Sequence, residues 1–247
     1  MKPIAVQLYS VREQLTADRG GTLRRLADIG YRMVEPYDPA HDPEGFRALL
    51  DETGLAVCST HAPVLTDARE QVASAAAVIG IDTVIVPAIP AEEFADSDGV
   101  ARTARRLNDT AAWAAGHGLR LGYHNHHWEL ASKVDGRPAL EVLADQLSSE
   151  VFLEVDVYWA AVGGVDVPDL LARLGDRVEY LHVKDGPAVN RDDPMTAVGA
   201  GTLPIPDILA AAPADAWRVV ELDRCATDML TALDESYQYV SGLEKQA

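Results

Sequence analysis

Short apolar runs alternate along the whole chain with longer segments in which apolar positions recur every three or four residues. The short runs are rich in β-branched residues, which is typical of buried strands. We predict eight strands, at residues 4–9, 33–35, 55–59, 83–86, 119–123, 151–155, 178–183 and 217–220.

The longer segments predict amphipathic helices between the strands. Several end at a glycine, and the helix that begins at Pro43 has proline at its start and Gly54 just past its end, as helices favour. A first helix includes Leu23, Leu26 and Ile29 and ends at Gly30. Further helices are predicted at residues 43–53, 66–79, 98–117, 138–147, 167–174, 205–211 and 227–243.

Eight strand-then-helix units follow one another without a linker or a low-complexity segment. Such alternation indicates parallel strands joined by crossover helices. We therefore predict an α/β fold in which residues 1–247 form a single (β/α)8 TIM barrel domain. An open doubly wound sheet is the alternative, but the first strand is not followed by its usual GxGxxG signature.

The acidic net charge of the chain disfavours one class of partner, nucleic acids. The chain has 39 acidic and 21 basic residues and a formal charge of −18. Nucleic-acid affinity depends largely on Lys and Arg contacts with phosphates, so we expect no nucleic-acid partner. The dense basic cluster of Arg102, Arg105 and Arg106 has helical spacing and is interpreted as a solvated helix face.

The sequence also gives an expectation of where the protein is found in the cell. Cys58 and Cys225 do not form a CxxC motif, and no apolar stretch approaches the roughly 20 residues that a membrane helix needs. Met1-Lys2-Pro3 leads straight into the first strand, so we expect no secretory leader. These features predict a cytoplasmic protein without a membrane partner.

Polar side chains gather where the predicted strands end, which is where barrel enzymes build their active sites. Five of the seven histidines lie in or beside these positions. The strand-end residues include Tyr9, Glu35, His61, residues 124–129 (His-Asn-His-His-Trp-Glu), Asp156, His182, Lys184, Glu221 and Arg224.

Three of these residues suggest a metal site. Asp156, His182 and Glu221 follow strands six, seven and eight, which are neighbours on the rim of one barrel and could form an open site for a divalent cation. Strand five would supply a fourth ligand, either His124 or His126 two residues further on. Each residue also has a structural interpretation, since a strand-end Asp can cap a helix and a lone His can be a satisfied polar group.

Five motifs, in order, resemble those of the sugar phosphate isomerase/epimerase family, which has a xylose isomerase-like TIM barrel. The motifs are Val6-Gln7-Leu8-Tyr9-Ser10-Val11-Arg12, Tyr123-His124-Asn125-His126, Asp156-Val157-Tyr158-Trp159, His182-Val183-Lys184-Asp185 and Val220-Glu221-Leu222-Asp223-Arg224. The resemblance implies one divalent ion (Mn, Mg, Co or Zn) held by Glu, Asp, His and Glu from strands five to eight. Asp156, His182 and Glu221 match the last three ligands, whereas His124 stands where the first glutamate is expected, as in a Tyr-His-Asn-His subgroup.

The same barrel also occurs in metal-dependent DNA repair endonucleases, and Thr60-His61-Ala62-Pro63 is similar to their sequences. Those enzymes use a three-metal cluster with additional histidines. Here Trp159 stands three residues after Asp156, and residues 195–202 contain no Asp-x-His. This difference and the acidic charge disfavour a DNA substrate, and His61 is interpreted as a pocket residue.

The resemblance implies a metal-dependent isomerase or epimerase that acts on a keto sugar or related polyol through an enediolate. Glu221 would bind the metal and move a proton, His124, His126 or Glu129 would act on the other side of the substrate, and Lys184 would steady the oxyanion. Glu129 could instead accept a substrate hydrogen bond or bind metal. Residues predicted to contact the carbohydrate are Tyr9, Glu35, His61, Trp159 and Arg224.

Other interpretations stay open at this point. A lyase acting on a 3-keto sugar or keto-inositol would use the same site, and a non-catalytic sugar-binding barrel is an alternative of another class. The loop Gly199-Ala200-Gly201 is a weaker candidate for phosphate contact through backbone N–H groups. A homodimer is compatible with a barrel of this type.

Overall fold

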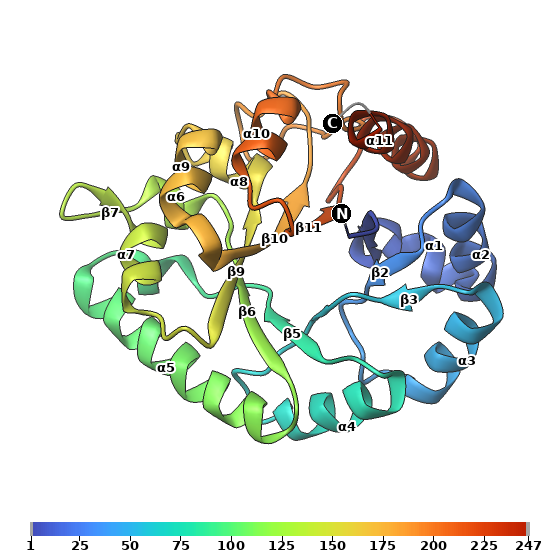
Figure 1. Ribbon diagram of the computed structural model, residues 1–247, viewed down its shortest axis with the longest axis horizontal. Coiled ribbons are helices and arrows are strands. Elements are labelled where there is room, and N and C mark those ends of the chain that lie inside the picture. Colours follow the sequence, from blue (N-terminus) through green and yellow to red (C-terminus); the bar gives the residue numbers. More distant parts are fainter. Residues whose placement is uncertain (1, 246–247) are drawn as a thin grey trace.

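The structure is a computed structural model that describes residues 2–245. Nine parallel strands form one nearly closed barrel in the order β3-β2-β1-β11-β10-β9-β6-β5-β4, and helices surround it (Figure 1). This architecture confirms the predicted barrel. The strands are β1 Ala5–Gln7, β2 Met33–Glu35, β3 Ala56–Val57, β4 Thr60–His61, β5 Thr83–Val86, β6 Arg120–His124, β9 Val151–Asp156, β10 Val178–Val183 and β11 Trp217–Val220.

The third predicted strand, residues 55–59, is shortened to β3, and the next residues form a separate short strand, β4, which is why nine strands appear instead of eight. β3 pairs with β2 and β4 pairs with β5, so the chain passes from one neighbour to the other between them. At the break, Tyr180 Oη donates to the Cys58 carbonyl at 2.8 Å and the Ser59 hydroxyl donates to Glu35. The Tyr180 hydroxyl therefore satisfies a backbone carbonyl at the break, while the Cys58 and His61 amides bond the backbone of Val34 and Pro36.

The helices form an outer ring (Figure 1), and the predicted segments match it with shifts of a few residues at their ends. The helices are α1 Arg12–Ala17, α2 Arg19–Ile29, α3 Pro43–Thr53, α4 Arg69–Ile79, α5 Ser97–Gly116, α6 Trp128–Ala131, α7 Ala139–Gln146, α8 Val157–Val162, α9 Val167–Leu174, α10 Ile205–Ala211 and α11 Met229–Glu244, with 3₁₀ turns at Leu8–Val11, Ala91–Phe94 and Gly175–Arg177. No helix within residues 2–245 is long and apolar enough to cross a membrane.

Aspartate caps account for part of the acidic surplus. Several helices begin with an Asp whose carboxylate accepts a hydrogen bond from the amide three residues on, as N-caps do. These caps are Asp18, Asp42, Asp96, Asp166 and Asp228.

A small hairpin was not predicted. It joins β7 Lys133–Val134 to β8 Arg137–Pro138 in antiparallel pairing. Asp135 and Gly136 form its turn with φ values of 52° and 80°, which is the left-handed geometry that Asp-Gly turns favour. The local signal was therefore present in the sequence.

Alternate residues along the strands fill the barrel in layers, because side chains alternate between the two faces of a strand. In β9, Phe152 belongs to a small apolar cluster with residues of other strands, including Tyr180 and Val219. The next inward positions on these strands are Glu154, His182 and Glu221. The barrel thus has an apolar floor below and a polar interior above, toward the ends of the strands.

Candidate active site

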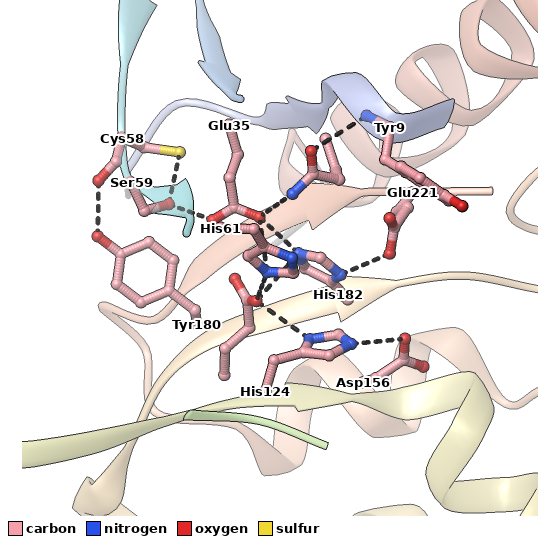
Figure 2. A network of polar contacts seen from close by, with 12 residues as sticks. Tyr9, Glu35, Cys58, Ser59, His61, His124, Asp156, Tyr180, His182 and Glu221 are labelled. Carbon is pink, nitrogen blue, oxygen red and sulfur yellow. Dashed lines mark hydrogen bonds and ion pairs between the residues drawn. The ribbon is translucent and has the colours of Figure 1, made fainter. Parts of the chain in front are cut away.

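Four side chains at the strand ends form a ring of potential metal ligands, which we call the rim site: His124 of β6, Asp156 of β9, His182 of β10 and Glu221 after β11. One ligand atom of each lies within 4.8 Å of the others, and all four side chains are buried. His182 Nδ1 lies 2.7 Å from Glu221 Oε2, and His124 Nε2 lies 3.7 Å from Asp156 Oδ2 (Figure 2). The barrel brings together side chains that are up to 97 residues apart, counting from 124 to 221.

Lys184 places a cation on the same ring. Its Nζ lies 2.6 Å from Glu221 Oε2, 2.9 Å from Asp156 Oδ2 and 3.0 Å from Asp223 Oδ2. Burial alone would lower the pKa of Lys184, but these three carboxylates outweigh it and raise the pKa well above its usual value. The ammonium therefore neutralises part of the negative charge on this ring.

The four ligands of the rim site suit a divalent ion, and one of their buried carboxylate oxygens has no hydrogen-bond partner. Two imidazoles and two carboxylates suit Mn, Co, Zn or Mg. Asp156 Oδ2 is buried and makes no hydrogen bond, only ion-pair contacts. Burial raises the pKa of Asp156 to about 6, against the effect of Lys184 and His182. Burial, with His182 nearby, holds the pKa of His124 well below its usual value, so its imidazole is neutral as a ligand requires.

Below the rim site lies a second polar cluster, centred on Glu154. Its Oε2 lies 2.6 Å from His61 Nε2, 3.1 Å from His124 Nδ1 and 3.2 Å from His182 Nε2. Glu35 Oε1 lies 2.7 Å from His182 Nε2 and accepts a hydrogen bond from the Gln7 amide at 2.6 Å. Figure 2 shows Glu35, His61, His124 and His182 converging from several strands.

The two interior carboxyl groups differ in their tendency to ionise. Burial would raise the pKa of Glu154, but His182 and His61 lower it well below its usual value. Burial, followed by the charge of Glu154, raises the pKa of Glu35. Glu154 therefore carries the negative charge, and its contacts hold the rings of His124 and His182 in place, as outer carboxylates do at metal sites.

An open cleft of about 630 Å³ lies above the rim site. Aromatic rings line its walls: Tyr9 packs edge-on against Tyr37 at a centroid distance of 5.4 Å, and Trp159 lies over Lys184 Nζ at 5.7 Å. Such faces suit the apolar side of a sugar ring. Arg12, which stacks on Tyr9, donates to the carbonyls of Tyr9 and Asp223.

His126 faces the cleft from a stacked aromatic pair. Its ring is parallel to Trp128 at 4.3 Å between centroids, and its buried Nδ1 has no hydrogen-bond partner. Burial, and secondly Lys184, lowers the pKa of His126 to about 3. The imidazole is therefore neutral near pH 7, with one polar atom that is not used inside the protein.

Most of the predicted site residues line this one cleft, and four fully buried ones do not: Glu35, Glu129, Asp156 and His182. The residues that line it are Tyr9, His61, His124, His126, Trp159, Lys184, Glu221 and Arg224. Glu35 is fully buried beneath them. Glu129 is also fully buried, where its carboxylate accepts hydrogen bonds from Tyr123 Oη at 2.6 Å and the His126 amide at 2.9 Å.

Sequence reasoning missed Glu154 and Asp223. Glu154 is two residues before Asp156 and therefore on the same side of β9, in a run that is otherwise apolar. Asp223 is likewise two residues after Glu221 and shares Lys184 with it. The period-two pattern of polar residues at the strand ends was the signal that could have found both.

The glycine loop after β10 is organised by Asp185. One carboxylate oxygen of Asp185 accepts hydrogen bonds from the amides of Gly199 and Gly201 at 2.9 and 3.1 Å, and the other from Gly186 and Leu203 at 2.8 and 3.2 Å. These glycine amides are therefore bonded within the protein and do not face a phosphate.

The fold and the rim site define a barrel of the xylose isomerase type. The family model for the xylose isomerase-like TIM barrel matches residues 23–225, so the chain belongs to this family. No curated protein matches the sequence significantly.

Solved structures share this fold at low sequence identity. A sugar phosphate isomerase/epimerase from Parabacteroides distasonis is 22% identical, with a TM-score of 0.82 over 96% of this chain and 92% of its own. The probable 3-DHS dehydratase AsbF of Bacillus anthracis is 12% identical, with a TM-score of 0.75 over 97% of this chain and 99% of its own. A xylose isomerase-like TIM barrel protein from Mycobacterium smegmatis in complex with magnesium is 15% identical, with a TM-score of 0.71 over 99% and 97%.

Proposed function

We propose that the chain is a divalent-metal-dependent isomerase or epimerase that acts on a keto sugar or related polyol through an enediolate. The observation that carries this proposal is the rim site, two imidazoles and two carboxylates at the floor of an aromatic-walled cleft. The isomerase/epimerase from Parabacteroides distasonis and the magnesium complex from Mycobacterium smegmatis, which share the fold, support it.

The ion would be held by His124, Asp156, His182 and Glu221. When bound, it would supply Lewis-acid polarisation of a substrate carbonyl and its neighbouring hydroxyl. The second ring nitrogens of both histidines contact Glu154, which fixes the ring orientations.

Three side chains at the cleft floor would handle protons and charge. Glu221 would accept the proton from the carbon beside the carbonyl, and Lys184, 2.6 Å from it, would donate to the oxygen on which charge develops. The His126 ring, which lines the cleft, would contact a substrate hydroxyl. Trp159 and Tyr9 would hold the sugar ring between them and exclude water.

A lyase is the second candidate, favoured by the asymmetry of these groups. A carboxylate and an ammonium meet at Glu221 and Lys184, whereas the group at His126 is a neutral imidazole. Two unlike groups suit β-elimination, in which one takes a proton and the other assists a leaving group. The dehydratase AsbF shares the fold and supports this candidate.

The test is proton NMR of the Mn²⁺- or Mg²⁺-loaded protein with a panel of keto sugars and 3-keto glycosides in deuterated buffer. Exchange of a carbon-bound proton with all atoms retained identifies an isomerase or epimerase, whereas release of water or an aglycone identifies a lyase. Glu221→Gln should abolish either reaction, and His117→Gln at the end of α5 is the matched control. Binding of sugars without exchange or elimination would instead indicate a non-catalytic sugar-binding barrel.

A further inference from the structure

The barrel interior offers a second set of metal ligands just below the rim site. We propose that His61, His124, Glu154 and His182 form an interior site for a divalent ion, alternative to the rim site, so that the chain holds one ion in either position. The inference rests on the metal-binding part of the proposed function. It adds a position in which the bound ion lies away from Lys184 and Glu221.

The interior ligands have the geometry of a compact N₃O set. Three imidazole nitrogens, of His61, His124 and His182, surround Glu154 Oε2 at 2.6 to 3.2 Å, and the four ligand atoms lie within 4.8 Å of one another. A tetrahedral ion with bonds of about 2.0–2.1 Å separates its ligands by roughly 3.3 Å. Of the three contacts to Glu154 Oε2, that of His61 would have to lengthen most, by about 0.7 Å on this geometry.

A second observation also indicates an unfilled site. Glu154 Oε1 has no hydrogen-bond partner, although the residue is fully buried. A buried carboxylate oxygen without a partner is costly. A cation bound to the Glu154 carboxylate would stabilise the charge at this oxygen.

The two sites share His124 and His182 through opposite ring nitrogens, and this makes them alternatives. His124 presents Nε2 to Asp156 and Nδ1 to Glu154, while His182 presents Nδ1 to Glu221 and Nε2 to Glu154 and Glu35. A neutral imidazole has a single lone pair for a metal and one N–H. An ion at the rim therefore leaves both N–H groups pointing inward to Glu154 and Glu35, and an ion inside leaves them pointing outward to Asp156 and Glu221.

The interior site can be reached from the cleft. His61 and His124 both line the cleft wall, and His61 keeps 8% of its surface exposed. Lys184 contacts Asp156 and Glu221 of the rim site, whereas Glu154 is contacted by imidazoles. Movement of the ion from one site to the other would exchange the N–H positions of the two shared rings, and substrate is expected to favour the rim.

The experiment is Co²⁺ loading with elemental analysis and visible absorption, because cobalt spectra distinguish N₃O from N₂O₂ ligand sets. Wild type should bind one ion per chain. Glu221→Gln should keep one ion per chain, in the interior site, with an N₃O spectrum. His61→Asn should keep one ion per chain, in the rim site, with an N₂O₂ spectrum. The double variant should bind less than about a tenth of an ion per chain. His117→Gln is the control.

The outcomes separate this inference from the proposed function. Loss of all metal in Glu221→Gln alone would overturn the interior site and leave the rim site intact. Two ions in wild type would overturn the alternation. Full metal in Glu221→Gln with none in His61→Asn would overturn the rim site, and with it both proposals.

Discussion

Lys184 is the residue on which the charge balance of the site depends. Its ammonium lies within 3.0 Å of three carboxylates, two of which are proposed metal ligands, so lysine and a dication compete for the same oxygens. The lysine is also the proposed donor to the developing oxyanion. Metal affinity and turnover should therefore respond to this side chain in opposite directions.

We predict that Lys184→Met binds Mn²⁺ at least about tenfold more tightly than wild type, since it removes a cation close to the ligands. The same variant should lose most of its turnover. Isothermal titration calorimetry measures the affinity, and Lys133→Met, which alters a lysine bonded to the Leu130 carbonyl outside the cleft, is the control. Equal Mn²⁺ affinity in Lys184→Met and wild type would contradict this account.

The free energy of unfolding should depend on pH through the buried carboxyl group of Glu129. Burial raises its pKa from 4.5 to about 7, against the hydrogen bonds from Tyr123 and two backbone amides. The folded chain therefore holds this proton more tightly than the unfolded chain. The resulting stabilisation is complete below pH 4.5 and is lost as the pH rises to about 7.

We predict that wild type loses about 2–3 kcal/mol more unfolding free energy than Glu129→Gln between about pH 5 and about pH 8. Urea unfolding at the two pH values measures the difference. Glu150→Gln, a change at an exposed carboxylate, should behave like wild type. Parallel pH profiles for wild type and Glu129→Gln would show that Glu129 does not keep its proton in the fold.

At the scale of elements, the loop between β10 and α10 is built around one carboxylate. Asp185 is fully buried and accepts four backbone hydrogen bonds, including those of Gly199 and Gly201. A Cβ at Gly201 would lie 2.1 Å from Asp185 Oδ1, so glycine is required for this close approach. Asp185 lies three residues after His182 and one after Lys184, so this loop supports the wall of the active site.

We predict that Asp185→Asn destabilises the protein by about 2–4 kcal/mol, because an amide NH₂ would face amides that need an acceptor. Urea unfolding measures this, with Asp207→Asn in the first turn of α10 as control. Inorganic phosphate should not restore the stability of the variant. A variant as stable as wild type would mean that the loop does not depend on Asp185.

At the scale of the whole molecule, the barrel and most strand ends could be predicted from the sequence, because buried parallel strands are continuous apolar runs. The break between β3 and β4 could not, since Tyr180 and Glu35 make the contacts there from other strands. Asp156, His182 and Glu221 could be placed on one rim from their positions at the strand ends. The burial of Glu129 could not be predicted, because it depends on a hydrogen bond from the Tyr123 hydroxyl, six residues earlier in the chain.

The central claim is that this barrel holds a divalent ion through imidazoles of β6 and β10. Elemental analysis of Mn²⁺-loaded wild type, His124→Ala, His182→Ala and the control His117→Ala tests it most directly, with circular dichroism to verify folding. We expect one ion per chain in wild type and the control, and none in the two variants. A folded wild type without metal, or variants that keep it, would contradict the account.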